Sequence, residues 1–171
     1  MSLDRTQVHG VDRLEHLGEK GEQPMAQLSA HFSLEEMTFS EMAVRHGIDN
    51  KPNAATRKNL MELCEDVLES VRRLAGGPII VTSGYRSPML NSLIGGAPDS
   101  QHKTGEATDI NCPLLNPREL FQRIRQSDIP FDQLIDEFGS WVHVSHRSPE
   151  NNRRQVLRAR KVGGVTKYDQ L

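Results

Sequence analysis

Apolar and polar residues recur along the chain with two different periods, and each period predicts a different kind of element. Residues 54–74 carry apolar side chains every three or four positions, which is typical of one long amphipathic helix. The apolar stripe consists of Leu60, Leu63, Val67, Val71 and Leu74. A short β-branched run at residues 79–82, preceded by glycine and proline, predicts a buried strand. The stripe of the helix must therefore cover a sheet or another helix.

Helix start signals predict several shorter helices. Residues 33–37 begin with a Ser-x-x-Glu capping box, and residues 40–47 begin with serine and end with glycine, as short helices do. Residues 87–88 and 116–117 each pair a capping residue with a proline at the first helical position. The second of these pairs precedes an apolar face that indicates a helix ending before residue 129.

The second half of the chain is dominated by short strand patterns. Residues 107–111, 132–137 and 141–146 predict strands, and a tight turn at residues 138–140 joins the last two. Residues 155–161 alternate and carry basic side chains, which favours an edge strand with those side chains in water. Helices followed by strands with intervening short helices predict an α+β fold, with a largely antiparallel sheet flanked by helices.

The length of 171 residues suits a single domain with tails. Residues 1–30 are polar, punctuated by glycine and without period, so we expect a flexible leader. The predicted domain occupies residues 31–162, and residues 163–171 are expected to form a C-terminal tail.

Composition excludes several classes of protein. The formal net charge is −2, so there is no general basic field that would favour nucleic acid as a partner. A basic cluster at residues 153–161 leaves a small nucleic-acid-binding domain as an alternative, but a solvated edge strand explains it more simply. No apolar run approaches the roughly 20 residues that span a bilayer, and the N-terminus has no signal-peptide pattern. We therefore expect a protein synthesised in soluble form in the cytoplasm, without membrane insertion.

The chain has two cysteines, Cys64 and Cys112, which are too few for a disulfide framework and are expected to be buried. The absence of a CxxC pair or a third cysteine excludes a thiolate zinc site. Any metal must then be held by histidine and carboxylate.

Three such residues have the pattern of a catalytic zinc site, which needs three protein ligands and an open position for water. His102 and Asp109 are separated by a glycine-bearing turn in SQHKTGEATD, and His143 lies in the strand pattern WVHVS. On that strand, Trp141 and Ser145 share the face of His143, while the two valines point the other way, into the core. Zn²⁺ is therefore the predicted cofactor.

The motifs SGYRSPMLN, IGGAPDSQHKTGEATDI and WVHVS together resemble the zinc D-Ala-D-Ala carboxypeptidase-type metallopeptidases, metallopeptidase family 15. The resemblance extends upstream to FSLEEMTFSEMA and GIDNKP, covering about residues 32–146. It implies a fold like that of Hedgehog and DD-peptidase domains, and zinc ligands at His102, Asp109 and His143.

The resemblance also implies that Arg86 contacts a carboxylate or carbonyl of the substrate, a role suited to its planar, permanently charged guanidinium. Its neighbour Tyr85 is a further candidate for substrate binding. Ser100 either orients a ligand, binds substrate or satisfies the backbone of its loop. His146, of opposite parity to His143, is expected near the site or on the surface rather than as a ligand.

The general base is expected from one of two neighbouring carboxylates. Many members of the family have an acidic residue or histidine two or three positions before the last histidine, where this chain has Trp141 and Ser140. The candidates are Glu137 and Asp136, and the turn decides between them. A three-residue turn puts Glu137 on the zinc face, whereas a turn of two or four residues puts Asp136 there. The resemblance favours Glu137, and Asp136 stays an alternative.

The implied activity is hydrolysis of peptidoglycan stem or cross-bridge peptides by a carboxypeptidase or an endopeptidase, with the enzyme reaching the cell wall after release or lysis, as an endolysin does. The alternative is a catalytically silent member of the same fold that acts as a cell-wall-binding or virion structural module.

Overall fold

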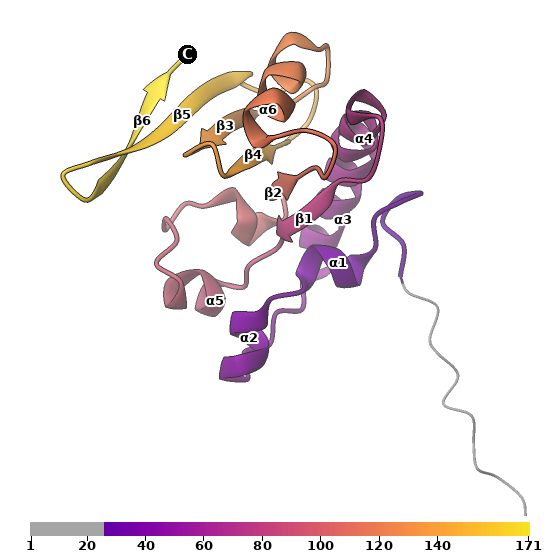
Figure 1. Cartoon of the computed structure of the whole chain (residues 1–171). Helices are drawn as coiled ribbons and strands as arrows, with labels where there is room; N and C mark the ends of the chain where they lie inside the picture. The colour runs from indigo at the N-terminus through magenta and orange to yellow at the C-terminus, as the bar shows by residue number, and fades with distance from the viewer. Residues whose placement is uncertain (1–25) are drawn as a thin grey trace, which may run out of the picture.

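The computed structural model describes residues 26–171, which form an α+β fold with one mixed sheet of six strands (Figure 1). The strands are β1 (Ile80–Ser83), β2 (Ala107–Asn111), β3 (Gln133–Glu137), β4 (Trp141–Ser145), β5 (Gln155–Val162) and β6 (Val165–Gln170). The helices are α1 (Leu34–Thr38), α2 (Glu41–His46), α3 (Ala54–Glu62), α4 (Glu69–Ala75), α5 (Pro88–Leu93) and α6 (Pro117–Gln126). A π-helical segment, η1 (Leu63–Leu68), joins α3 to α4, and a 3₁₀ turn, η2 (Gln101–Thr104), precedes β2.

The sheet has the strand order β1-β2-β4-β3-β5-β6, and only the pairing of β3 with β5 is parallel. The prediction of a largely antiparallel sheet is therefore confirmed. Paired residues on neighbouring strands point to the same face of a sheet. The register pairs Asp109 with His143, and His143 with Ile135, so these three side chains share one face.

The opposite face carries the main core. Ile110, Val142, Val144 and Leu134 from the sheet pack with α6 and with the continuous helix made by α3, η1 and α4. The predicted apolar stripe of that helix supplies Leu60, Leu63, Val67 and Val71, all fully buried. These helices thus cover one face of the sheet, and Asp109 and His143 lie on the other face.

Local signals place the short helices as predicted. Ser33 caps α1 by accepting a hydrogen bond from the Glu36 amide, and Ser87 caps α5 with Pro88 in its first turn. Asn116 and Glu119 form a complete capping box at the start of α6. Both cysteines are free and buried.

The structure differs from the predicted division of the chain at both ends. Residues 163–171 are not a tail, because β6 pairs with β5 over its whole length. The strand β5 is consequently internal rather than an edge, and β6 takes the edge position. At the other end, Leu28 is buried in the core, so part of the predicted leader is packed, while residues 1–25 lie outside the described residues.

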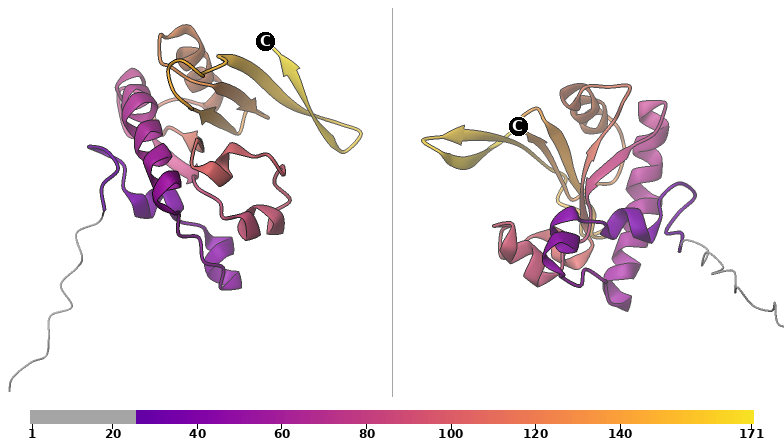
Figure 2. Two further views of the ribbon diagram at one scale, coloured as in Figure 1. Left: turned by 180° about the vertical axis from the view of Figure 1, so that it is seen from behind. Right: turned by 60° about the horizontal axis from the view of Figure 1, so that its bottom comes forward.

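Beyond the body of the sheet, β5 and β6 form a two-stranded ribbon that projects away from the helices (Figures 1 and 2). Among the helices between residues 26 and 171, none is both long enough and apolar enough to cross a lipid bilayer.

Candidate metal centre

His102 is held rigidly on η2, the 3₁₀ turn before β2. Its side chain is buried, and its Nδ1 donates a hydrogen bond to the carbonyl of Gly84 at 2.7 Å. This bond leaves Nε2 as the free ring atom, in the tautomer that a metal-ligating histidine needs. The turn ends at Gly105, which has a φ of 75°. A Cβ at this position would lie only 2.6 Å from the carbonyl oxygen of Thr56, so glycine is required there.

Asp109 and His143 are direct cross-strand neighbours on β2 and β4. The Nδ1 atom of His143 lies 2.9 Å from Oδ1 of Asp109. His102 on η2 precedes Asp109 by seven positions, and the chain turns at Gly105 between them to enter β2. This turn brings Nε2 of His102 to 3.4 Å from Oδ1 of Asp109.

The three side chains form a cluster with the dimensions of a zinc site. The distance between Nε2 of His102 and Nδ1 of His143 is 3.3 Å, which closes a triangle with the 2.9 and 3.4 Å edges to Asp109. Ligand atoms at zinc bonding distance in a tetrahedral shell lie about 3.3 Å apart. Two imidazole nitrogens and one carboxylate oxygen are also a donor set that zinc accepts. Among residues 26–171, this is the group of histidines, cysteines and carboxylates that could hold a metal ion.

The electrostatics of the cluster favour the protonation states that bind metal. Burial alone would raise the pKa of Asp109, but the charge and hydrogen bonds of His102 and His143 hold it well below its usual range. Burial lowers the pKa of His102, and the positive charges of His143 and Arg86 act in the same direction against the attraction of Asp109. A carboxylate beside a neutral buried imidazole is ready to coordinate a cation at neutral pH.

Arg86 is attached to the cluster through Asp109. Its Nη2 donates to Oδ2 of Asp109 at 2.7 Å, and its Nε donates to the hydroxyl of Ser83 at 2.8 Å. The Arg86 amide also donates to the carbonyl of His102. Arg86 therefore occupies one carboxylate oxygen of Asp109 and leaves Oδ1 directed at the two histidines.

The hairpin between β3 and β4 places Glu137 on the face of the cluster. The turn at residues 138–140 has three residues, and it pairs Glu137 with Trp141 and Ile135 with His143, which is the register that puts Glu137 beside the metal ligands. Burial raises the pKa of Glu137, and the attraction of His143 is opposed by the charges of Asp109 and Asp136. Among the described residues, its carboxylate has no hydrogen-bond partner in another side chain.

The structure does not bring Asp136 to the cluster, although the sequence leaves it as an alternative base. Its side chain points to the opposite face, where Oδ1 accepts from the Gly139 amide at 2.8 Å and Oδ2 accepts from Nε of Arg158 at 3.0 Å. The parity of the strand separates the two adjacent carboxylates.

The other predicted site residues lie around the cluster rather than in it. Tyr85 is buried and lines, with Ser83 and Arg86, a cavity of about 360 Å³ bounded by residues of α2 and α5. Ser100 precedes η2, and none of its hydrogen bonds within residues 26–171 reaches a candidate ligand. His146 is buried, and its Nε2 lies 3.1 Å from Oδ2 of Asp66, so it links β4 to η1 on the helical side.

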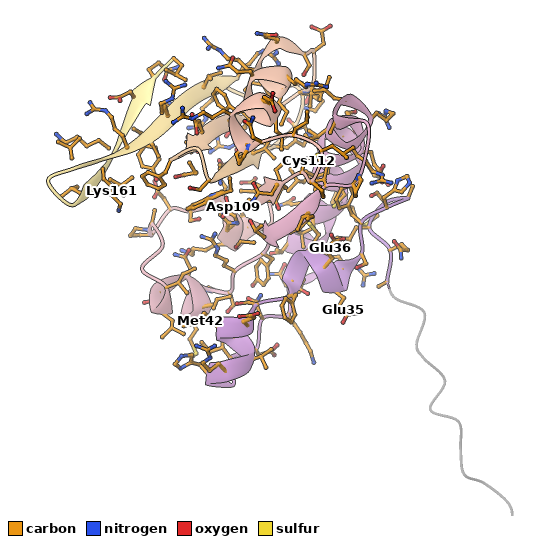
Figure 3. The ribbon with its side chains drawn as sticks, in the orientation of Figure 1. Glu35, Glu36, Met42, Asp109, Cys112 and Lys161 are labelled. Atoms are coloured by element: carbon orange, nitrogen blue, oxygen red, sulfur yellow. The ribbon has the colours of Figure 1, made fainter. Side chains whose placement is uncertain are left out.

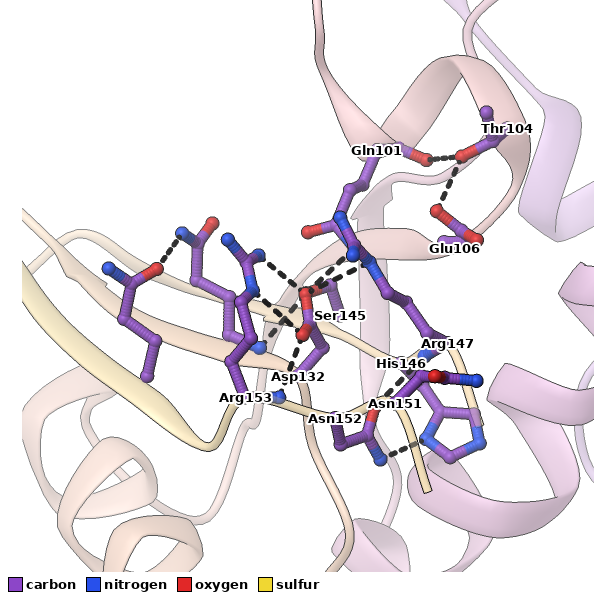
Figure 4. Close-up of polar contacts among 12 residues, drawn as sticks. Gln101, Thr104, Glu106, Asp132, Ser145, His146, Arg147, Asn151, Asn152 and Arg153 are labelled. Carbon is purple, nitrogen blue, oxygen red and sulfur yellow. Dashed lines mark hydrogen bonds and ion pairs between the residues drawn. The ribbon is translucent and has the colours of Figure 1, made fainter. Parts of the chain in front are cut away.

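A buried carboxylate that the sequence did not single out, Asp132, supports the turn of His102 (Figure 4). It accepts hydrogen bonds from Nε2 of Gln101 at 3.0 Å and from the backbone amide, Nε and Nη2 of Arg153 at 2.9, 2.9 and 2.5 Å. Gln101 is the residue before His102. The pairing of Asp132 with Arg153 and Gln101 ties η2 to the starts of β3 and β5. The sequence places Asp132 only at the start of a predicted strand, where nothing marks it as a buried partner of two other elements, so only the fold reveals this role.

The comparisons with known proteins agree with this geometry. A family model, Peptidase M15, matches residues 30–145. A search of curated proteins finds no match. The matched region runs from just before α1 to the end of β4, so it contains His102, Asp109, His143, Arg86 and Glu137. The family supports a metallopeptidase. Since the match covers most of the chain and the whole cluster, the chain belongs to the peptidase M15 family.

Proposed function

We propose that the protein is a zinc-dependent peptidase that hydrolyses peptide bonds in the stem or cross-bridge peptides of peptidoglycan. The observation that carries this proposal is the triangle of His102, Asp109 and His143, which has the size and donor set of a three-ligand zinc site, with Glu137 on the same face of the sheet. A site of this composition, with one position left for substrate or water, is characteristic of hydrolytic rather than structural zinc.

Zinc held by these three residues would polarise the scissile carbonyl and lower the pKa of water at the site. Glu137 would take one proton from the attacking water as its oxygen bonds to the carbonyl carbon. As the carbon–nitrogen bond breaks, Glu137 would return that proton to the leaving amine. The position of Glu137 suits this work, since its carboxylate is partly desolvated and no side chain among the described residues binds it.

Arg86 would anchor the substrate. Its Nε and Nη2 are used by Ser83 and Asp109, and this pairing fixes the plane of the guanidinium. Among residues 26–171, no acceptor is found for its Nη1, so this edge can bind a carboxylate or carbonyl of the peptide. The same arginine would then orient both the metal ligand Asp109 and the substrate.

The geometry supports an enzyme over a catalytically silent binding module. A silent module would need no carboxylate beside the ligands, whereas the three-residue turn presents Glu137 there and leaves it without a structural partner among the described residues. Membership of the family does not choose between a carboxypeptidase and an endopeptidase, and the assay below distinguishes them by the bond that is cut.

The test is digestion of purified peptidoglycan of several wall chemistries by the zinc-loaded protein, with new peptide termini identified by mass spectrometry. We expect cleavage by the wild type and loss of about 10³-fold or more in Glu137→Gln, with zinc content unchanged. Glu65→Gln is the matched control, because Glu65 is exposed on η1, away from the site face, and undergoes the same chemical change. Failure of the wild type to cut any of these walls, or full cleavage by Glu137→Gln, would overturn the proposal.

A further inference from the structure

The site face of the sheet continues past the family match onto the C-terminal ribbon. β5 and β6 lie beyond residue 145, where the match ends. Their register pairs Glu137 with Ala159, and Ala159 with Tyr168. With Trp141 opposite Glu137, one cross-strand row runs Trp141, Glu137, Ala159, Tyr168, and all four side chains emerge on the face of the metal cluster.

Packing around Phe138 fixes the ribbon beside this row. The Phe138 ring meets the Trp141 ring edge-on, with centroids 5.9 Å apart. On the β5 side, the ammonium group of Lys161 lies 5.5 Å from the centroid of the Phe138 ring. Phe138 also packs against a small apolar cluster of Ile135, Leu157 and Ala159, separate from the main core. The ribbon is therefore anchored to the site-side face, and Lys161 marks where it extends outward (Figure 3).

Tyr168, at the outer end of this row, has a side chain that is accessible to a ligand. Its side chain is 52 % exposed, so much of the ring is free for a ligand. The intervening residue is Ala159, whose side chain is only a methyl group, so no large side chain in the row separates Tyr168 from Glu137. Partial burial raises the pKa of Tyr168, and the negative charges of Glu137 and Asp109 raise it further, which agrees with a hydroxyl that faces the site.

We propose that the β5–β6 ribbon is a substrate-binding wall of the peptidase, and that Tyr168 contacts peptide residues remote from the scissile bond. This inference rests on the proposed function. The ring offers a flat apolar surface for the peptide backbone and a hydroxyl for its amides, a combination that makes tyrosine frequent in binding sites.

The strand spacing sets the length of substrate that can reach this wall. From β4, which carries His143, to β6 there are three strand intervals. At about 4.8 Å for each interval this is about 14 Å, which an extended peptide covers in about four residues. A dipeptide unit at the metal is therefore too short to touch Tyr168, whereas a stem pentapeptide is long enough.

The test compares a synthetic stem pentapeptide with the acetylated dipeptide that contains the same scissile bond. For Tyr168→Ala we expect KM for the pentapeptide to rise about 10-fold, with kcat/KM for the dipeptide within twofold of wild type. Lys167→Ala is the control, because Lys167 is exposed on the opposite face of the same strand. Circular dichroism and zinc content check that Tyr168→Ala keeps the fold and the metal, and Tyr168→Phe separates the hydroxyl from the ring.

A binding measurement keeps this inference distinct from the proposed function. Trp141, the single tryptophan of the chain, lies in the same row, so its fluorescence should change when the pentapeptide binds to Glu137→Gln. Adding Tyr168→Ala to that variant should weaken binding about 10-fold.

The outcomes separate the two proposals. If the wild type cleaves and Tyr168→Ala cleaves both substrates with wild-type kinetics, the ribbon is no substrate wall, although the peptidase proposal stands. If nothing is cleaved but Tyr168→Ala weakens binding, the proposed activity fails while the wall stands. Unaltered binding and cleavage in Tyr168→Ala would refute the inference.

Discussion

The carboxylate of Asp132 should contribute a measurable, pH-dependent part of the stability of the fold. Its side chain is fully buried, and its two oxygens accept hydrogen bonds from Gln101 and from three groups of Arg153. Burial opposes ionisation, but these contacts prevail and lower the pKa of Asp132 from 3.8 to about 2. Since one pKa unit corresponds to about 1.4 kcal/mol, the ionised form stabilises the folded state by roughly 2 kcal/mol at neutral pH.

Asp132→Asn keeps the size of the side chain but removes the charge and turns one acceptor into a donor facing Arg153. We expect the free energy of unfolding to fall by about 2 to 4 kcal/mol at pH 7, because a buried ion pair loses one partner while Arg153 can still reach water. The folded-state pKa is depressed, so the contribution of Asp132 is present above its unfolded pKa and is lost as the pH falls from about 4 towards 2. The gap between wild type and variant should therefore be about 1 kcal/mol narrower at pH 3 than at pH 7.

Urea unfolding of the chelator-treated protein, followed by the fluorescence of Trp141, measures this gap. Asp128→Asn serves as the control, because Asp128 is exposed on the loop before β3 and undergoes the same substitution. A gap below 0.5 kcal/mol at pH 7, or a gap that stays constant down to pH 3, would refute the assignment of Asp132 as a buried ionised group.

Two further predictions concern the metal cluster and the end of β1 beside it. Removing zinc with a chelator should lower the melting temperature of the wild type by about 5 to 10 °C, as measured by differential scanning fluorimetry. Zinc at 100 times its dissociation constant would stabilise the folded state by about 2.7 kcal/mol. His143→Ala, which lacks one ligand, should show no such shift. Gly84→Ala should lower the free energy of unfolding by about 3 kcal/mol in thermal or urea unfolding. The new Cβ would lie 2.2 Å from the carbonyl oxygen of Met37. A variant as stable as the wild type would contradict this tight packing after β1.

The parts of the structure that the sequence predicted are those encoded by neighbouring residues. The helical period from Leu60 to Val71 and the capping residues at Ser33 and Asn116 act within a few positions, so they identify elements without knowledge of the fold. The placement of Glu137 is also local, because the length of one turn sets the register of one hairpin.

The parts that were wrong concern β5 and β6. The alternating basic residues of β5 suggested an edge strand, but β5 is internal because β6 pairs with the side that β3 leaves open. The parallel pairing of β5 with β3 has no local sequence signal. Its other partner, β6, did leave a signal. Gly163 and Gly164 both have positive φ between two runs that alternate, which is the pattern of a two-residue hairpin turn. Taken as a hairpin, these glycines would have extended the domain to residue 170.

Adjacent carboxylates on β3 show how the turn and the chemistry depend on each other. Glu137 and Ser140 close a turn in which Phe138 and Gly139 both have positive φ, a conformation that is unfavourable for phenylalanine. Asp136 stabilises this turn from the helical side by accepting a hydrogen bond from the Gly139 amide, while Arg158 of β5 holds the same carboxylate. If the turn lost or gained one residue, the parity of β3 would reverse and Asp136 would face the metal ligands instead. The carboxylate on the far face thus supports the turn whose length sets the register that presents Glu137.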